Sequence, residues 1–379
     1  MTTTDTSGIL SPTMDADPST PLLFQPITIR GLTVRNRIWV APMCQYSVSK
    51  LDGVPTDWHL VHLGAMATGG AGIVIVEASA VNPEGRITDR DTGIWNTEQR
   101  EAWAHIVEFL HAQGAAAGIQ LAHAGRKAST YPAWGTDHTG TVPANGGGWP
   151  TVSASAIPFG SYAAPAALDA AGIDGVVADF VQGAIRSVEA GFDLLEIHAA
   201  HGYLLHQFLS PLSNTREDEY GGNLENRARL LVRIVREIRT AVGEAVPLMV
   251  RFSATDWSEG GWDQEQTATV TEWVAAAGAD FADVSSGGNI SGARIPLSPG
   301  YQVPFASFVR KTSGTPTGAV GLITTATHAE EILQSGDADI ILLGRELLRD
   351  PHFALRAAHE LGVEIDYWPG QYERAQWRD

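Results

Sequence analysis

The sequence is poor in cysteine and in basic residues. Its 379 residues include one cysteine, Cys44, which excludes an intrachain disulfide and an all-cysteine zinc or iron–sulfur site. A lone thiol is typical of a reducing compartment, so we expect a cytoplasmic protein. The 25 Lys and Arg residues stand against 43 Asp and Glu residues, for a formal net charge of −18. We therefore expect no binding to nucleic acid or to an anionic membrane.

Signals for targeting and membrane insertion are also lacking. The first 29 residues contain no Lys or Arg, whereas secretory and transit peptides begin with a basic region. We predict that residues 1–21 form a disordered leader. Residues 58–76, an apolar stretch without Asp, Glu, Lys or Arg, contain two His and four Gly. This stretch predicts a short helix, a turn and a strand, not a membrane span.

Apolar runs rich in Val and Ile alternate with stretches of helical spacing from about residue 37 onward. The predicted strands are residues 38–43, 72–81, 118–123, 193–198, 248–253, 281–285, 319–323 and 340–343. The predicted helices are residues 97–113, 175–190, 224–242, 263–277, 325–334 and 351–361. Eight β/α units with strands apolar on both faces predict an α/β fold, the closed (β/α)8 TIM barrel. A doubly wound open sheet is the alternative, but Ala41–Cys44 has Pro where that fold needs a Gly-rich turn.

One predicted connection is much longer than the others. Residues 126–172 are rich in Pro, Gly, Ser and Thr and show no helical period, which predicts an excursion that caps one end of the barrel. The barrel domain itself is predicted over residues 22–370. Residues 371–379 mix aromatic and basic side chains, and we predict a C-terminal tail that makes contacts.

TIM barrels place their active sites at the carboxyl ends of the strands. His198, His201 and Tyr203 follow the fourth predicted strand. Two imidazoles in this position can aim N–H donors at one oxygen and polarise a carbonyl, and a phenol can deliver a proton to a nearby carbon. Two alternatives stay open at this point. A zinc site that adds His206 would make the protein a metal-dependent TIM-barrel hydrolase, and the histidines could instead be satisfied inside the fold.

Residues at four other strand ends suggest a phosphate-bearing ligand. Gly321 and Gly344, followed by Arg345, come after the seventh and eighth strands, where barrels often bind phosphate through backbone N–H groups. Arg251 would add a fixed positive charge, although a buried ion pair with a core carboxylate is its alternative role. Gln120 can donate and accept at once, as the edge of a planar heterocycle requires.

These segments resemble the Old Yellow Enzyme family of FMN-dependent ene reductases, from about Phe24 to Trp377. The longest matching block runs from His198-Ala-Ala-His201-Gly-Tyr203 to Arg227, and Ala41–Cys44, Gln120–Lys127 and Gly344–Pro351 support it. Cys44 and the Tyr-Glu-Arg-Ala sequence of the tail are similar to the bacterial, thermophilic-like subclass of xenobiotic reductase-like enzymes. Gln45 departs from relatives that often carry an apolar residue there.

The resemblance implies non-covalently bound FMN, NADPH or NADH as hydride donor, and no metal. The residues implied to hold the flavin ring are Ala41, Pro42, Met43, Cys44, Ala78, Gln120 and Arg251, and those implied to hold its phosphate are Gly321, Gly344 and Arg345. Arg251 would stabilise the anionic reduced flavin, and Cys44 would adjust its reduction potential.

The resemblance also implies the substrate and the residues that bind it. Hydride would reach Cβ of an α,β-unsaturated aldehyde, ketone, nitroalkene or imide in ping-pong turnover. His198 and His201 would hold the activating oxygen, and Tyr203 would protonate Cα. Tyr46 and Lys127 would line the pocket, and Arg374 would reach the pocket of a neighbouring subunit in a homodimer or homotetramer. A non-catalytic flavin-binding sensor is a further alternative, because it would not need Tyr203.

Overall fold

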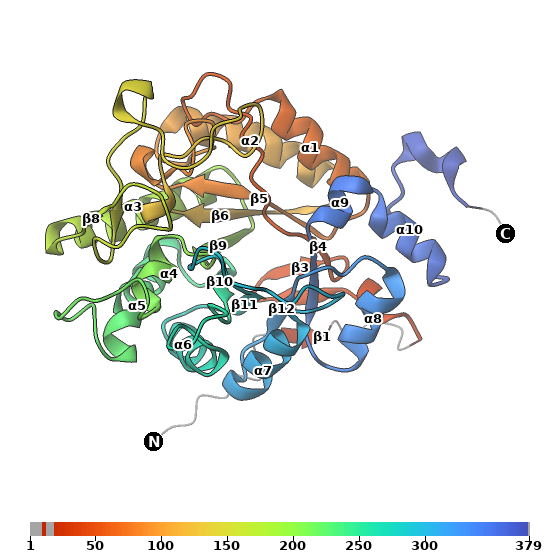
Figure 1. Ribbon diagram of the computed structural model, residues 1–379. Helices are drawn as coiled ribbons and strands as arrows, with labels where there is room; N and C mark the ends of the chain where they lie inside the picture. The colour runs from red at the N-terminus through yellow and green to blue at the C-terminus, as the bar shows by residue number, and fades with distance from the viewer. Residues whose placement is uncertain (1–9, 13–18, 378–379) are drawn as a thin grey trace.

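The computed structural model describes residues 10–12 and 19–377, and within them eight parallel strands form a closed barrel (Figure 1). In order around the barrel, the strands are β4 (Ile38–Val40), β5 (Ile73–Ala80), β6 (Ala116–Ala122), β9 (Leu194–Ala199), β10 (Leu248–Ser253), β11 (Phe281–Ser285), β12 (Thr317–Ala319) and β13 (Ile340–Leu343), which pairs with β4. The predicted TIM barrel is confirmed.

Helices surround the barrel (Figure 1). They are α1 (Asp57–Thr68), α2 (Thr97–Ala112), α3 (Ala170–Glu189), α4 (Leu204–Leu209), α5 (Leu224–Val242), α6 (Gln264–Ala276), α7 (Val303–Ser313), α8 (Ala326–Gln334), α9 (Arg345–Arg349) and α10 (Phe353–Glu360). The predicted helices correspond to α2, α3, α5, α6, α8 and α10. Helix α3 begins five residues earlier than predicted, because the Asp169 side chain caps it by accepting the Gly172 N–H (2.8 Å).

The seventh strand lies earlier in the sequence than its apolar pattern predicts. The prediction was 319–323, but β12 ends at Ala319. Gly321 and Leu322 have φ values of 125° and 54°, which lie outside the β region. Gly321 therefore lies in the loop that follows β12 and not at the end of the strand.

A short hairpin contributes to the core at the amino end of the barrel. Strands β2 (Ile27–Ile29) and β3 (Leu32–Val34) pair antiparallel, and their buried side chains pack with Trp39 and Phe281 inside the barrel. Of the predicted leader, residues 1–9 and 13–18 lie outside the described residues, and β1 (Leu10–Pro12) pairs with β2. The hairpin leaves the carboxyl ends of the barrel strands as the place for a site.

The long connection after β6 lies over that carboxyl end (Figure 1). It contains only short elements, among them β7 (Val152–Ser153) and β8 (Ala166–Ala167). The indole N–H of Trp134 donates to the Gln45 carbonyl (3.0 Å), and that of Trp149 donates to the Glu84 carbonyl (2.9 Å). These bonds attach the excursion to the loops that follow β4 and β5.

The C-terminal tail packs on its own chain as far as residue 377. Trp377 stacks on His359, with ring centroids 5.0 Å apart and an interplanar angle of 11°, and the Tyr372 ring meets His352 at 5.6 Å. The predicted contacts of the tail are thus made at least with α10. Among the described residues, no helix is long and apolar enough to cross a membrane.

Candidate active site

The predicted site residues of neighbouring strands lie side by side at one end of the barrel. Ala78 of β5 is in register with Gln120 of β6, and His198 of β9 is in register with Arg251 of β10. The Ala41 N–H donates to the Leu343 carbonyl (2.9 Å), which joins the end of β4 to the end of β13. The closed barrel therefore gathers residues that are far apart in the sequence.

A buried polar layer joins β6, β9, β10 and β11. The Gln120 carboxamide donates to the Glu196 carboxylate, and Arg251 Nε lies 2.9 Å from Asp283 Oδ2. Burial and the nearby charge of Asp283 raise the pKa of Glu196 to about 8, against the opposing charge of Arg251. Glu196 is thus mainly protonated at neutral pH. Asp283 is the single ion-pair partner of Arg251 within the described chain, so the buried ion pair considered for Arg251 is present.

The residues of the predicted substrate group are close together. The His198 and His201 rings meet nearly edge-on at a centroid distance of 5.2 Å, and the His198 and Tyr203 rings meet at 5.0 Å. Lys127 Nζ lies 5.0 Å from the centre of the Tyr203 ring and donates to the backbone carbonyls of His201 (2.8 Å) and Gly288 (2.9 Å). Lys127 therefore borders the same group.

The electrostatic environment keeps the two imidazoles neutral. Burial and the positive charge of Arg251 hold the pKa of His198 and of His201 well below the ordinary value. Burial raises the pKa of Tyr203 well above its ordinary value and, with Arg126, lowers the pKa of Lys127 to about 8. At neutral pH each imidazole has one N–H donor, and the phenol keeps its proton.

The hydrogen bonds restrict which imidazole nitrogen can face a ligand. The Ala200 N–H donates to His198 Nδ1 (3.3 Å), so the proton of His198 is on Nε2. His201 Nε2 is 2.8 Å from Ser285 Oγ. Ser285 has one hydroxyl proton, and Gln302 Oε1, 3.3 Å away, is a second acceptor for it. If that proton goes to His201 Nε2, the proton of His201 is on Nδ1, and both rings have a donor free for a ligand.

Contacts with β10, α4 and the loop after β11 fix the backbone at His201. Its φ is 57°, in the left-handed region, and its N–H donates to Ser253 Oγ (2.9 Å). The next N–H, that of Gly202, donates to His206 Nδ1 (3.0 Å). A Cβ at Gly288 would lie 2.6 Å from the His201 Cα, so only glycine fits there. The packing thus maintains an unfavourable backbone conformation that places the His201 ring.

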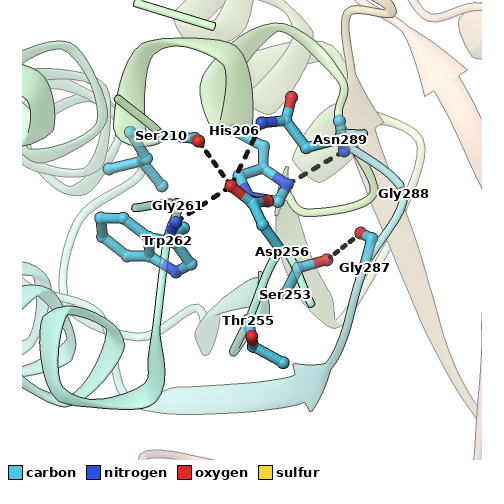
Figure 2. A network of polar contacts seen from close by, with 12 residues as sticks. His206, Ser210, Ser253, Thr255, Asp256, Gly261, Trp262, Gly287, Gly288 and Asn289 are labelled. Carbon is cyan, nitrogen blue, oxygen red and sulfur yellow. Dashed lines mark hydrogen bonds and ion pairs between the residues drawn. The ribbon is translucent and has the colours of Figure 1, made fainter. Parts of the chain in front are cut away.

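His206 belongs to a supporting network and not to the substrate group. Figure 2 shows its ring directed at Asp256, with Nε2 3.1 Å from Oδ1 and both side chains fully buried. The Ser210 hydroxyl (2.5 Å) and the Trp262 N–H (3.0 Å) donate to the other carboxylate oxygen of Asp256. The described residues contain no group of three His, Cys, Asp or Glu side chains that could hold a metal. The metal-dependent hydrolase is therefore not supported.

Gly321, Gly344 and Arg345 line one pocket of about 80 Å³ after β12 and β13. Arg349, which the sequence analysis did not propose, lines it too. Glu346 lines the pocket as well and pairs with Arg349. Backbone at two glycines beside the Arg345 guanidinium is a donor set that fits a phosphate. The chemistry of this pocket therefore agrees with a phosphate-bearing cofactor.

The loop after β4 approaches the phosphate pocket. Met43 Sδ lies 3.6 Å from the position that a Cβ at Gly344 would take. Pro42 and Cys44 flank Met43 in this loop, and the Gln45 side chain turns back to the Met43 carbonyl (2.9 Å). The loop therefore runs beside the pocket, so both can contact the same ligand.

Cys44, Tyr46 and Tyr203 form a group that interacts electrostatically. Burial raises the pKa of the Cys44 thiol well above its ordinary value, and burial also raises the pKa of Tyr46. All three side chains are therefore neutral at pH 7. A neutral thiol is a poor nucleophile, which agrees with a tuning role for Cys44.

Arg374 is not brought to the site. It is exposed in the turn Gly370–Ala375, and within the described part of the chain it contacts none of the other predicted site residues. Its role across a subunit interface stays a prediction.

Sequence reasoning missed several polar residues that support the site. Glu196 lies two residues before His198 on β9, and Asp283 lies two residues before Ser285 on β11. Alternate residues of a strand share a face. A polar residue two positions before each strand end therefore indicated that the barrel interior is polar near the carboxyl ends of β9 and β11. Asp256 lies in a loop, and no periodic signal could have found it.

A TIM barrel that combines a pocket lined by two glycines and Arg345 with two neutral imidazoles and a half-buried phenol has the parts of a flavin-dependent oxidoreductase. The sequence profile described as the NADH:flavin oxidoreductase / NADH oxidase family matches residues 22–364, and the chain belongs to this family. It is 47% identical over 357 residues to a protein of Listeria innocua serovar 6a named NADPH dehydrogenase, a match that covers 94% of this chain and 99% of the relative.

Solved structures of the same fold agree. Morphinone reductase is 27% identical with a TM-score of 0.74, and the match covers 92% of this chain and 91% of that chain. A complex of 2-naphthoyl-CoA reductase with 2-naphthoyl-CoA is 26% identical with a TM-score of 0.80; this chain is 90% covered but spans about half of that protein, 52%. The protein is thus an oxidoreductase of the flavin-dependent TIM-barrel type.

Proposed function

We propose that the protein is an FMN-dependent ene reductase that uses NAD(P)H to reduce the C=C bond of an α,β-unsaturated aldehyde, ketone, nitroalkene or imide. The observation that carries the proposal is the neutral pair His198 and His201 beside the phenol of Tyr203. Polarising donors next to a proton donor are what addition across an activated double bond requires.

The chain offers a complete set of residues to hold FMN, which when bound supplies the relay of hydride from NAD(P)H to Cβ of the alkene. Gly321, Gly344 and Arg345 would bind the phosphate, and Gln120 and Arg251 would face the isoalloxazine ring. Arg251 has terminal N–H groups that remain after its bond to Asp283. The ring would also contact Ala78 and the loop Ala41–Cys44.

His198 and His201 bind the activating oxygen of the alkene. Because both rings are neutral, the two N–H donors stabilise negative charge on that oxygen without giving up a proton. Their positions are fixed by backbone and side-chain bonds, so little reorganisation accompanies the reaction. Lys127 and Tyr46 border the substrate.

Tyr203 supplies the proton to Cα. Its raised pKa ensures that the proton is present at neutral pH, and polarisation by the two imidazoles makes Cα basic enough to take it. Cys44 stays a neutral thiol that adjusts the potential of the bound flavin.

The proposal extends to the assembly. In a homodimer or homotetramer, the exposed Arg374 would enter the pocket of the neighbouring subunit and add a positive charge near the activating group. The single cysteine supports a cytoplasmic location.

A visible spectrum of the purified protein with added FMN tests the cofactor, and anaerobic NADPH followed by 2-cyclohexen-1-one tests the reaction. We expect flavin absorption that NADPH bleaches and the enone restores, with formation of cyclohexanone. Bleaching without reoxidation by any activated alkene would support a non-catalytic flavin sensor, and the absence of bound flavin would contradict the proposal.

A further inference from the structure

A small cavity separates Tyr203 from a second ionisable side chain, Asp91. The cavity has a volume of about 10 Å³, which is close to the space that one water molecule needs. Alanines of β5 and β6 and the backbone near Gly85 form most of its wall, and its polar side chains are those of Asp91 and Tyr203. A water in this cavity would be bordered by both Asp91 and Tyr203.

Asp91 is fixed in place without a cation. Its side chain is buried, with Oδ2 accepting the Ile87 N–H (2.7 Å) and Oδ1 accepting the Thr88 hydroxyl (2.7 Å). No ion pair to Asp91 is formed within the described ranges of the chain. The nearest basic residue that influences it, Arg86, donates instead to the carbonyls of Leu51 (2.9 Å) and Asp89 (3.2 Å).

The other ionisable groups around Asp91 do not compensate its charge. Glu77, Cys44, Tyr46 and Tyr203 interact with it electrostatically, and none of them is basic. Burial and the charge of Glu77, opposed by the Thr88 hydroxyl, raise the pKa of Asp91 to about 7. Asp91 can therefore hold a proton and release it near neutral pH.

The ene-reductase function proposed above creates a need for such a group. Each turnover removes the phenolic proton of Tyr203, and the half-buried tyrosinate must regain one before the next alkene is reduced. We propose that Asp91 is a proton-relay residue that reprotonates Tyr203 through one water molecule in this cavity. The carboxyl group gives its proton to the water, the water gives a proton to the tyrosinate oxygen, and the carboxylate later takes a proton from solvent.

The test separates the first turnover from later ones. In Asp91→Asn holoenzyme, a single turnover of prereduced protein with 2-cyclohexen-1-one should keep the wild-type rate, because Tyr203 already has its proton. Steady-state kcat should fall about tenfold or more, since proton delivery by a positioned acid is lost. The solvent deuterium isotope effect on kcat should rise, and the decrease in wild-type kcat above about pH 7 should disappear.

Two further variants make the result specific. Ala80→Val adds two methyl groups to the cavity wall and should reproduce the kcat loss with Asp91 intact. Asp89→Asn changes a carboxylate of the same loop that does not line the cavity, and it should behave as wild type. It serves as the matched control for the change in charge.

Two results would overturn the relay. One is wild-type kcat, pH profile and isotope effect in both Asp91→Asn and Ala80→Val. The other is an equal loss in single-turnover reduction, flavin reduction by NADPH and steady-state kcat, which would show a structural role. A wild-type holoenzyme that binds FMN but reduces no activated alkene would instead contradict the proposed function.

Discussion

His206 Nε2 lies 3.1 Å from Oδ1 of Asp256, and neither side chain has contact with solvent (Figure 2). Through Nδ1, His206 also accepts the N–H of Gly202, the residue that follows His201. This contact thus connects the loop after β10 to the backbone that places the His201 imidazole. Loss of the contact between His206 and Asp256 should lower the free energy of unfolding.

Removal of the carboxylate should destabilise the fold strongly. Asp256→Ala leaves His206, Ser210 and the Trp262 N–H without their acceptor, and each buried donor left unpaired costs roughly 1–3 kcal/mol. Urea denaturation would measure the free energy of unfolding. The control is Glu189→Ala, which breaks an exposed pair with Arg100 and should cost about 0–1 kcal/mol. Equal effects of the two substitutions would contradict the structural role of Asp256.

The same carboxylate should make the free energy of unfolding depend on pH in acidic solution. Burial would raise the pKa of Asp256, but the neighbouring His206 and the hydrogen bonds to the carboxylate lower it to about 2. Because the pKa of Asp256 in the folded state is below the unfolded value of ~3.9, its contribution to stability is fully present at pH values above the unfolded pKa. It is lost as the pH falls through the folded value, and amounts to roughly 2–3 kcal/mol. Urea titrations of wild type and Asp256→Asn should therefore converge in strongly acidic solution; a constant difference would be evidence against this pKa.

Ser285 should determine how well His201 binds the activating oxygen. Ser285→Ala removes the partner of His201 Nε2 and lets the ring take the other tautomer, so we expect the KM for 2-cyclohexen-1-one to rise about 2- to 10-fold, the equivalent of one hydrogen bond. Ser286→Ala is the control, because Ser286 donates to Gln302 (2.6 Å) and has no bond to His201. A larger effect of Ser286→Ala than of Ser285→Ala would show that the tautomer of His201 is not the cause.

Arg374 provides a test of the shared pocket. If the tail of one subunit enters the pocket of its neighbour, Arg374→Ala should weaken the binding of a carbonyl ligand without changing FMN content. Titration of the flavin spectrum with an aromatic aldehyde measures that affinity, and Glu373→Gln in the same turn is the matched control. Unchanged affinity in Arg374→Ala would remove Arg374 from the site.

The sequence was sufficient for the barrel and for the residues at its strand ends. Runs of Val and Ile marked the strands, and position after a strand singled out His198 and Arg251, which the register places side by side. The closed parallel barrel brings the carboxyl ends of all its strands to one end, so these positions could be assigned to that end from the predicted fold. The flavin roles came from resemblance, since spacing cannot assign them.

The residues that sequence reasoning missed depend on contacts between distant loops. Asp256 meets His206 and Asp91 faces Tyr203 only after the chain has folded, and loops have no period that announces such pairs. The error at the seventh strand is of the same kind, because the left-handed backbone at Leu322 is set by tertiary packing. Local apolar character could not reveal it.

The most direct test of the proposed function compares the two half-reactions in Tyr203→Phe. Stopped-flow reduction of the FMN holoenzyme by NADPH should proceed at nearly the wild-type rate, because no proton from Tyr203 is needed. Reoxidation by 2-cyclohexen-1-one should slow by ~10²–10⁴-fold, the usual loss when a general acid is removed. Equal slowing of both half-reactions, or reoxidation by the enone at the wild-type rate, would contradict the assignment of Tyr203 as the proton donor of an ene reductase.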